Sequence, residues 1–398
     1  MARRRLALVL AGLCIFAGLV GIRQANGDPF DHTIAMSGDP VAVAVDSQTQ
    51  RAFVINGADF TVSVIDTVSG EVIRSVAIGT GANTLAVVDR TNRVFVPNTG
   101  DNTVSILDAR SGLVRHTVAL GYSPSLIAVN HASGRVYVTN TPSATLSILD
   151  GSSGALLHTV PLRSEPLAMA VNTVTGRLFI AAGDNTVQAR DAETGKLLHT
   201  TSVGGFPAAI GVDPRTSRVF VADPTHAAVK ILDGRTGAVL RVTHVAKNPI
   251  ALVTLNTLGR VAVASLSTMP NATGPSVVSI LDAGTGQLLQ SLPISAGPQA
   301  LAADDRDGAV LVDVGTAILE IDATTGVVTH SLPVLGIRFT GQAMAVDTST
   351  GHLFIVNSDN SNPSTNDNVV GWVHQWLPWL PHRVPSPYGS ISEYDARR

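Results

Sequence analysis

Short apolar runs of Val, Ile and Leu recur along most of the chain, separated by turns rich in Gly, Asn and Asp. The third copy shows the unit clearly, with apolar runs at 126–129, 136–139, 146–149 and 156–160. Runs of this length and composition, bounded by turn residues, are typical of β-strands. No helical periodicity interrupts them over residues 40–340. The pattern predicts an all-β protein built from four-stranded units.

Three sequence markers repeat in phase with these units. A basic residue precedes the centre of most second strands, and a proline opens most first strands. An Asp-x-x-[Ser/Thr]-Gly turn recurs every 40 to 49 residues, and its aspartates are Asp66, Asp108, Asp150, Asp191, Asp233, Asp282 and Asp322. Four strands repeated about every 42 residues are the signature of a β-propeller blade. We therefore expect residues 28–398 to form a single β-propeller.

Eight copies of the repeat predict an eight-bladed ring, and the seven-bladed alternative would require one copy to be spurious. The eighth copy ends at Arg398, after an expected third strand at Ser390–Tyr394, and lacks a fourth strand. The segment His32–Met36 resembles the other fourth strands, several of which begin with a His-Thr or His-Ser pair. We therefore predict that this N-terminal strand closes the last blade.

Residues 1–27 lie outside the predicted propeller. Three arginines precede an apolar run from Leu6 to Ile22, and small residues follow at 25–27. This order is that of a secretory signal peptide. The run is also close to the shortest helix that spans a membrane, so a retained N-terminal anchor is the alternative. Both interpretations imply an extracytoplasmic protein, which is secreted, periplasmic or at the cell surface.

Charge and cysteine content narrow the function classes. The N-terminal segment holds Cys14, the only cysteine, and four arginines, so the rest of the chain carries 23 basic and 30 acidic residues. The resulting net charge of −7 argues against nucleic acid as a main partner, because binding phosphates requires a basic surface. A chain with one cysteine has neither a disulfide framework nor a Cys-based zinc site.

Residues 137–140 read Tyr-Val-Thr-Asn, and with its eight repeats the chain resembles the YVTN β-propeller repeat family. That family includes YncE-like exported proteins and archaeal surface-layer proteins. The resemblance covers residues 30–398 and implies a propeller with a binding or surface role.

The Asp-x-x-[Ser/Thr]-Gly turn is also similar to the docking motif of quinoprotein dehydrogenases, which have eight blades. In those enzymes a tryptophan follows the glycine by four residues. In this chain the corresponding residues are Arg74, His116, His158, His199, Arg241, Gln290 and His330. The similarity thus implies a quinoprotein-like architecture and weakens an enzymatic interpretation.

The direction of the chain sorts the loops of each blade. If the strands of a blade are lettered a to d, the a–b and c–d turns lie at one end and the b–c and d–a loops at the other, which we call the loop face. Two insertions, 266–276 and 358–389, are expected in b–c loops. Because function usually resides on variable loops held by a rigid scaffold, we expect the binding site on the loop face.

The candidate binding residues lie on this face. The second insertion contains all three tryptophans, Trp372, Trp376 and Trp379. They form a cap packed on the propeller, an exposed aromatic patch for a partner, a glycan or a membrane surface, or a cofactor site. The charged candidates in the d–a loops are Asp39, Glu165, Lys247 and Arg338. Ordinary solvated loop charge is the alternative for these four.

The sequence predicts neither a catalytic residue nor a metal centre. The histidines of the d strands lie in different blades, so they cannot meet at one zinc ion. No cofactor is expected, and calcium at Asp359 and Asp367 is the one ion left open.

We therefore predict an exported, non-enzymatic propeller that binds an envelope protein, a glycan or a small molecule through its loop face. It would contact a membrane only through a retained N-terminal anchor. The alternative is a propeller enzyme, a lactonase-like hydrolase or an oxidoreductase, with its site at the channel mouth.

Overall fold

The structure, a computed structural model, describes residues 32–36, 38–267, 275–294, 297–315, 317–333, 344–347, 352–357 and 369–374. These residues form strands β1 to β32 and two short 3-10 helices, η1 (Asp89–Thr91) and η2 (Pro224–His226). The prediction of an all-β propeller is confirmed. Within the described residues, no helix is long and apolar enough to cross a bilayer.

Seven sheets are each built from four consecutive strands, and we number them one to seven along the chain. Sheets one to three are β2 (Pro40–Asp46), β3 (Arg51–Asn56), β4 (Thr61–Asp66), β5 (Val72–Ala77); β6 (Ala86–Val88), β7 (Arg93–Asn98), β8 (Thr103–Asp108), β9 (Val114–Ala119); and β10 (Pro124–Asn130), β11 (Arg135–Asn140), β12 (Thr145–Asp150), β13 (Leu156–Pro161). Sheets four and five are β14 (Pro166–Asn172), β15 (Arg177–Ala182), β16 (Thr186–Asp191), β17 (Leu197–Ser202); and β18 (Ala209–Asp213), β19 (Arg218–Asp223), β20 (Ala228–Asp233), β21 (Val239–His244). Sheets six and seven are β22 (Pro249–Leu255), β23 (Arg260–Ser265), β24 (Ser276–Asp282), β25 (Leu288–Ile294); and β26 (Ala300–Asp304), β27 (Ala309–Asp313), β28 (Ala317–Asp322), β29 (Val328–Pro333).

A further four-stranded sheet joins the two ends of the described chain. It comprises β1 (His32–Ala35), β32 (Val369–His374), β31 (His352–Asn357) and β30 (Met344–Asp347), in that spatial order. β1 pairs antiparallel with β32, with His32 opposite Trp372. The predicted closure by the N-terminal strand is therefore confirmed, and this composite sheet brings the four-stranded sheets in the described residues to eight. If the composite sheet is left out, the seven sheets of consecutive strands give the seven-bladed alternative.

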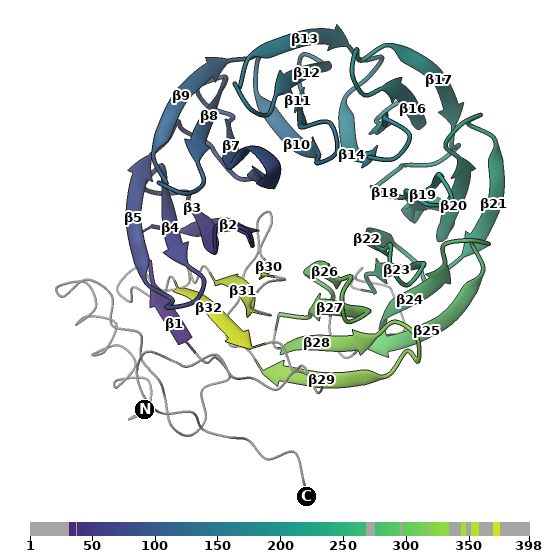
Figure 1. Cartoon of the computed structure of the whole chain (residues 1–398). Helices are drawn as coiled ribbons and strands as arrows, with labels where there is room; N and C mark the ends of the chain where they lie inside the picture. Colours follow the sequence, from purple (N-terminus) through teal and green to yellow (C-terminus); the bar gives the residue numbers. More distant parts are fainter. Residues whose placement is uncertain are drawn as a thin grey trace, which may run out of the picture.

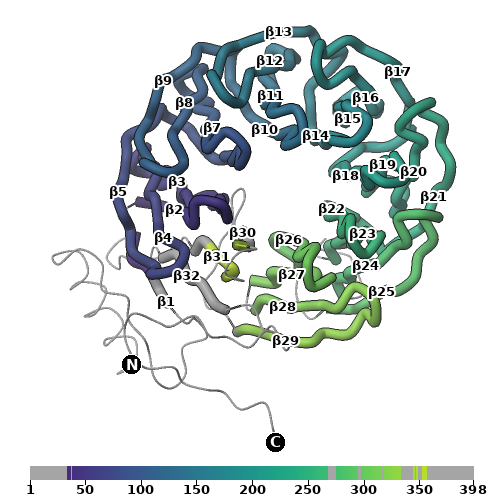
Figure 2. Tube along the Cα trace, in the orientation of Figure 1, coloured from purple at the N-terminus to yellow at the C-terminus, as the bar shows by residue number. Residues whose placement is uncertain are grey.

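The sheets surround a common axis, with the first strand of each innermost and the fourth outermost (Figure 1). The trace in Figure 2 follows the same circular path. Each first strand contacts the first strand of the next sheet, and β30 contacts both β26 and β2. The ring is thus continuous across the junction of the chain ends.

The third strand of the composite sheet corrects one expectation. It was expected at Ser390–Tyr394, but Val369–His374 occupies this place, so residues 358–389 are not a single b–c loop. Val369–His374 is itself rich in strand-forming residues and follows β31 more closely, which makes the connection shorter. The other predicted insertion, 266–276, is nearly as expected, because β23 ends at Ser265 and β24 begins at Ser276.

The core lies between neighbouring sheets. The centre of the second strand is fully buried, and in six sheets it is aromatic: Phe53, Phe95, Tyr137, Phe179, Phe220 and Phe354. Ala262 and Leu311 occupy the same place in sheets six and seven. One apolar cluster joins Phe53 and Val64 of sheet one to Val94 and Leu107 of sheet two. Each sheet therefore buries its faces against its neighbours and holds its loops on a rigid base.

A second contact locks the outer strands together. Gly154, in the turn between β12 and β13, has a φ of 75°, and a Cβ there would lie 2.6 Å from Nε2 of His116 on β9. The same arrangement brings Gly237 against His199. The position that holds tryptophan in quinoprotein docking motifs therefore packs a histidine against the glycine of the next sheet here.

Candidate functional site

The last residue of each second strand lies at the loop face and forms the base of the site. In sheets one to three this residue is a buried asparagine: Asn56, Asn98 and Asn140. Nδ2 of Asn98 donates to the hydroxyls of Thr103 and Ser105 on the third strand, at 2.9 Å each. Asn56 and Asn140 make the same pair of bonds. The repeat thus satisfies the Nδ2 group of this buried amide with two hydroxyls of its own sheet.

Sheet five replaces this neutral network with charged groups. Asp223 takes the place of the asparagine, Ala228 that of the threonine and Lys230 that of the serine. Nζ of Lys230 donates to Oδ2 of Asp223 at 2.6 Å and also to the carbonyl of Val203. Nδ1 of His226 lies 2.6 Å from the same Oδ2. We call Asp223, His226 and Lys230 the Asp223 cluster.

The local sequence explains how His226 reaches the carboxylate. Pro224 begins the short helix η2, and Oδ1 of Asp223 caps it by accepting the backbone N–H groups of Thr225 and His226. Proline suits the first position of a helix because it has no N–H to satisfy there. Asp223 therefore contacts both the backbone N–H and the ring of His226, and together these two contacts restrain the imidazole beside the carboxylate.

Asp223 is ionised in this setting. Burial disfavours its charge, but hydrogen bonds from Lys230 and His226 outweigh burial and hold the pKa of Asp223 below its usual value. The ionised carboxylate accepts a hydrogen bond from Nδ1–H of His226, and in the tautomer with its proton on Nδ1 the imidazole has Nε2 as an acceptor. The His226 side chain is half exposed, whereas Asp223 is fully buried. The cluster therefore presents one oriented imidazole at the loop face.

Two residues of the preceding d–a loop, Gly205 and Phe206, lie next to the Asp223 cluster. At Gly205, a Cβ would lie 2.3 Å from Oδ1 of Asp223, so only glycine allows this close approach. The next residue, Phe206, is exposed, and its N–H donates to the hydroxyl of Thr225. An exposed aromatic ring thus stands on the loop adjoining the imidazole.

Sheet seven carries a buried aspartate one position earlier in the repeat, where sheet five has Ala222. Asp313 ends β27 and is fully buried, and its Cα partners are Ala300 of β26 and Ile318 of β28. Oδ1 accepts the N–H of Gly315 at 2.6 Å, while Oδ2 is buried without a partner among the described atoms. Burial raises the pKa of Asp313 to about 6, although the bond from Gly315 works against this.

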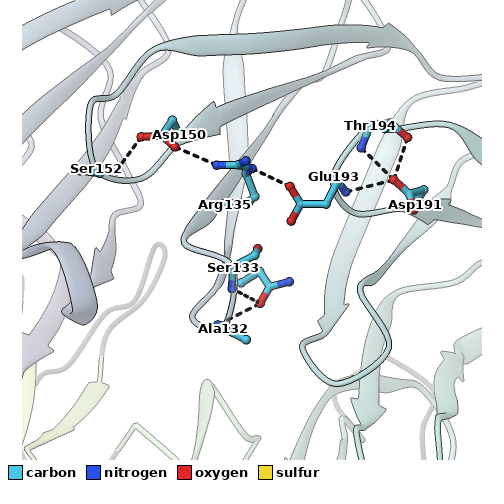
Figure 3. A network of polar contacts seen from close by, with 9 residues as sticks. Ala132, Ser133, Arg135, Asp150, Ser152, Asp191, Glu193 and Thr194 are labelled. Carbon is cyan, nitrogen blue, oxygen red and sulfur yellow. Dashed lines mark hydrogen bonds and ion pairs between the residues drawn. The ribbon is translucent and has the colours of Figure 1, made fainter.

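The opposite end of the ring, where the a–b and c–d turns lie, uses its charges internally. Arg135 donates to Asp150 at 2.8 Å and to Glu193 of the next sheet at 2.9 Å, and Asp150 also accepts turn N–H groups (Figure 3). The corresponding Arg51–Asp66, Arg93–Asp108 and Arg260–Asp282 pairs recur around the ring. The charged side chains at this end therefore stabilise the turns and the contacts between sheets.

The structure places three of the predicted charged residues on the loop face, in separate connections. Asp39 is half-buried between β1 and β2, and its carbonyl accepts the N–H of Gly57. Glu165 and Lys247 are exposed, before β14 and β22 respectively. The structure records no bond that joins these three side chains to one another in its described part. Arg338 lies outside the described residues.

The tryptophan prediction is only partly covered. Trp372 lies within strand β32, where its Cα is opposite those of Phe354 and His32. The expectation that it belongs to a loop insertion is therefore wrong. Trp376 and Trp379 lie outside the described residues, as do the calcium candidates Asp359 and Asp367. In the part of the chain that the structure describes, no three His, Cys, Asp or Glu residues gather in a metal-binding arrangement.

Sequence reasoning missed Asp223, His226, Lys230 and Asp313. For the Asp223 cluster the available signal was the break in the repeat, since Asn, Thr and Ser recur at three positions in sheets one to three and become Asp, Ala and Lys in sheet five. No such signal marks Asp313, which lies one position before the residue equivalent to Asp223. A repeat position that carries hydrogen bonds in several copies and charge in one marks a local change of role.

The closed ring and its loop face define an all-β propeller protein of quinoprotein-like architecture. A family model described as outer membrane protein assembly factor BamB matches residues 58–175 and 100–326, and the chain belongs to that family. No curated protein sequence matches the chain.

Several solved structures share the fold. The dihydro-heme d1 dehydrogenase NirN, in complex with DHE, is 15% identical, with a TM-score of 0.63 over 90% of this chain and 76% of that one. The computationally designed Ika8 protein is 19% identical, with a TM-score of 0.63 over 85% and 97%. Kuenenia stuttgartiensis hydrazine synthase is 14% identical, with a TM-score of 0.57 over 89% and 99%. At these identities the similarity concerns the fold alone.

Proposed function

We propose that this protein is an exported binding module of the cell envelope, related to the YVTN-repeat propellers, which holds a partner on its loop face around the Asp223 cluster. The observation that carries the proposal is the half-exposed His226, held by a buried and ionised Asp223 where other sheets have a neutral network. The N-terminal segment and the family membership support an envelope location.

The geometry favours recognition because the polar groups are oriented before any partner arrives. Both the cap of η2 and the bond from Nδ1 restrain His226, so little conformational entropy remains to be lost on binding. Nε2 offers a hydrogen-bond acceptor, and exposed Phe206 offers an aromatic surface nearby. An envelope protein, a glycan or a small molecule with hydroxyl or amide donors fits this combination.

Site-specific crosslinking tests the proposal. A photoreactive residue at position 226 should give one dominant adduct when the protein is expressed in its own envelope, and Asp223→Ala should weaken that adduct because the helix loses its cap. The same residue at position 131, an exposed histidine at the opposite end of the ring, serves as the control. An identical adduct from both positions would assign the contact elsewhere.

A second candidate function rests on the same pair. A histidine oriented by a buried carboxylate is an arrangement that serves as a general base, so His226 is able to accept a proton from an attacking water molecule. This favours a hydrolase of the lactonase-like kind over an oxidoreductase. Assays with lactones and aryl esters should then show turnover that His226→Ala abolishes and His131→Ala retains. Equal turnover in both variants would remove this candidate.

A further inference from the structure

Three segments of the loop face meet around the b–c turn of sheet five and are joined by hydrogen bonds. The N–H of Phe206, in the connection before sheet five, donates to the hydroxyl of Thr225 at 3.3 Å. The N–H of Val245, in the connection after sheet five, donates to the carbonyl of Ala227 at 2.9 Å. Because Thr225 and Ala227 are the chain neighbours of His226, both connections are fastened next to the half-exposed imidazole.

Lys247 adds a positive charge to this part of the loop face. It is exposed and follows Val245 by two residues, in the connection that is bonded to the b–c turn. The nearly buried Lys230 already has its counter-charge, because its ammonium group lies 2.6 Å from Oδ2 of Asp223. No ion pair among the described residues gives Lys247 a counter-charge. Its ammonium group is therefore available to an anion from outside the chain.

The charge of the surrounding loops limits where such an anion binds. Away from sheet five and its two connections, the charged side chains in the described loops of this face are Asp39, Asp59, Asp101, Arg163, Glu165 and Asp184. All of these except Arg163 are acidic, so they repel an anion from the first four sheets. A ligand with one carboxylate, placed beside Lys247, fits this distribution better than a long polyanion.

The three exposed groups around the turn correspond to three parts of a sugar acid. Nε2 of His226 is an acceptor for a sugar hydroxyl, and Asp223 restrains the imidazole before the ligand arrives. The exposed ring of Phe206 is a flat apolar surface on which the C–H groups of a sugar ring pack. The ammonium group of Lys247 forms a charge-assisted hydrogen bond with a carboxylate.

We propose that the loop face of sheet five binds a uronic acid, a sugar with a carboxylate in place of its hydroxymethyl group, either free or at the end of a glycan. A hydroxyl of the sugar donates to Nε2 of His226, one face of the sugar ring packs on Phe206, and the carboxylate accepts from Nζ of Lys247. This assignment rests on the proposed function, because it names the ligand of the same site.

Titration of the full chain with methyl β-D-glucuronide tests the assignment. Methyl β-D-glucoside is the matched neutral ligand, because it carries a hydroxymethyl group where the glucuronide carries the carboxylate. Saturation-transfer NMR measures both Kd values and shows which sugar protons contact the protein. The glucuronide should bind about tenfold more tightly than the glucoside. Free glucuronate should bind as well as the glycoside if the ligand is the free sugar acid, and more weakly if it is the end of a glycan.

Variants of the exposed groups separate their roles. Lys247→Met should weaken the glucuronide about tenfold and leave the glucoside unchanged, which removes the preference for the acid. His226→Ala and Phe206→Ala should weaken both ligands. The matched controls are Lys196→Met, at an exposed lysine of the opposite end, and Phe60→Ala, at an exposed phenylalanine on the loop face of sheet one. Both controls should bind as wild type does.

Three outcomes would overturn the uronic acid assignment. They are equal Kd values for the glucuronide and the glucoside, an unchanged preference in Lys247→Met, and displacement of the glucuronide by an equal concentration of inorganic phosphate, which would show that any anion suffices. If one of these occurs while the photoreactive residue at position 226 still gives its adduct, the binding module has a different ligand. Loss of that adduct as well would remove the proposed function together with the assignment.

Discussion

Asn98 and Asp223 occupy the same place in their sheets, yet they bind different partners. Nδ2 of Asn98 donates to two hydroxyls, whereas Asp223 accepts from an ammonium and an imidazole. Because the position is fully buried in both sheets, each side chain depends on the residues that the third strand supplies. A change at the end of one strand thus requires matched changes in the next.

This dependence predicts the effect of neutralising Asp223. Asp223→Asn should destabilise the protein by about 3 kcal/mol, because Lys230 would remain nearly buried without its counter-charge. The double variant Asp223→Asn/Lys230→Ser restores the asparagine–serine pair of sheets one to three and should recover most of the loss. Urea unfolding of both variants measures this difference. A double variant no more stable than the single one would contradict the assigned pairing.

Asp313 predicts a pH dependence of opposite sign to that of most buried acids. Its pKa is raised to about 6 in the folded state, so the folded protein holds this proton more tightly than the unfolded chain does. The resulting stabilisation is complete below the unfolded value near 4 and is lost as pH rises to about 6, for a total of about 3 kcal/mol. The free energy of unfolding of wild type relative to Asp313→Asn should fall over this range. Urea titrations from pH 4 to 7 would show parallel curves if Asp313 were not involved.

Among the elements, the turn between the third and fourth strands joins each sheet to the previous one. Gly154 has a positive φ, and the side chains of His116 and Ile106 from sheet two pack against it. Gly134, in the turn between β10 and β11, has a similar φ of 70°, but a Cβ there would meet nothing within 4 Å. A substitution at Gly134 therefore strains only the backbone, whereas a substitution at Gly154 also creates a steric clash with the neighbouring sheet.

Alanine at the two positions should have unequal effects. Gly134→Ala should cost about 1 kcal/mol through its left-handed backbone alone. Gly154→Ala should cost about 1–2 kcal/mol more, because the added Cβ would lie within 3 Å of both His116 and Ile106. Denaturant unfolding compares them directly. Equal losses of unfolding free energy would mean that His116 and Ile106 move aside for the added Cβ at no energetic cost.

The prediction of the last sheet shows where sequence patterns reach their limit at this scale. The b-strand His352–Asn357 and the closing strand β1 were recognisable from their repeat markers. The partner strand Val369–His374 was not, because it lacks the Asp-x-x-[Ser/Thr]-Gly turn that marks the other third strands. Two segments with similar strand propensity were available, and pairing with β31 and β1 decided between them.

At the scale of the whole molecule, closure depends on β1. This strand covers the outer edge of β32, and the buried side chain of Ile34 packs with Phe354 of its own sheet and with Val54 of sheet one. The ring thus joins its first and last sheets through one short segment. Loss of that segment would leave an exposed strand edge, which is a site for pairing with other chains.

Deletion of residues 32–36 should therefore promote association. We expect the truncated protein to elute as oligomers in size-exclusion chromatography with light scattering, and to unfold at lower temperature because Ile34 and Met36 lose their buried sites. A chain that begins at residue 32 is the matched control and should keep the oligomeric state of the chain that begins at residue 28. A monomeric deletion variant of unchanged Tm would show that β1 does not hold the ring closed.

The amino-acid sequence by itself determined the strand period, the four-stranded unit and the role of the N-terminal strand, because repeated turns and apolar runs are local signals. The tertiary structure alone decided which strand completes the last sheet and which side chains meet at the loop face. Asp223, His226 and Lys230 are ordinary residues in the sequence, and they become a site only because the end of one strand, a capped turn and the next strand converge on one buried carboxylate. Contacts of this kind depend on the register between strands, which no single segment specifies.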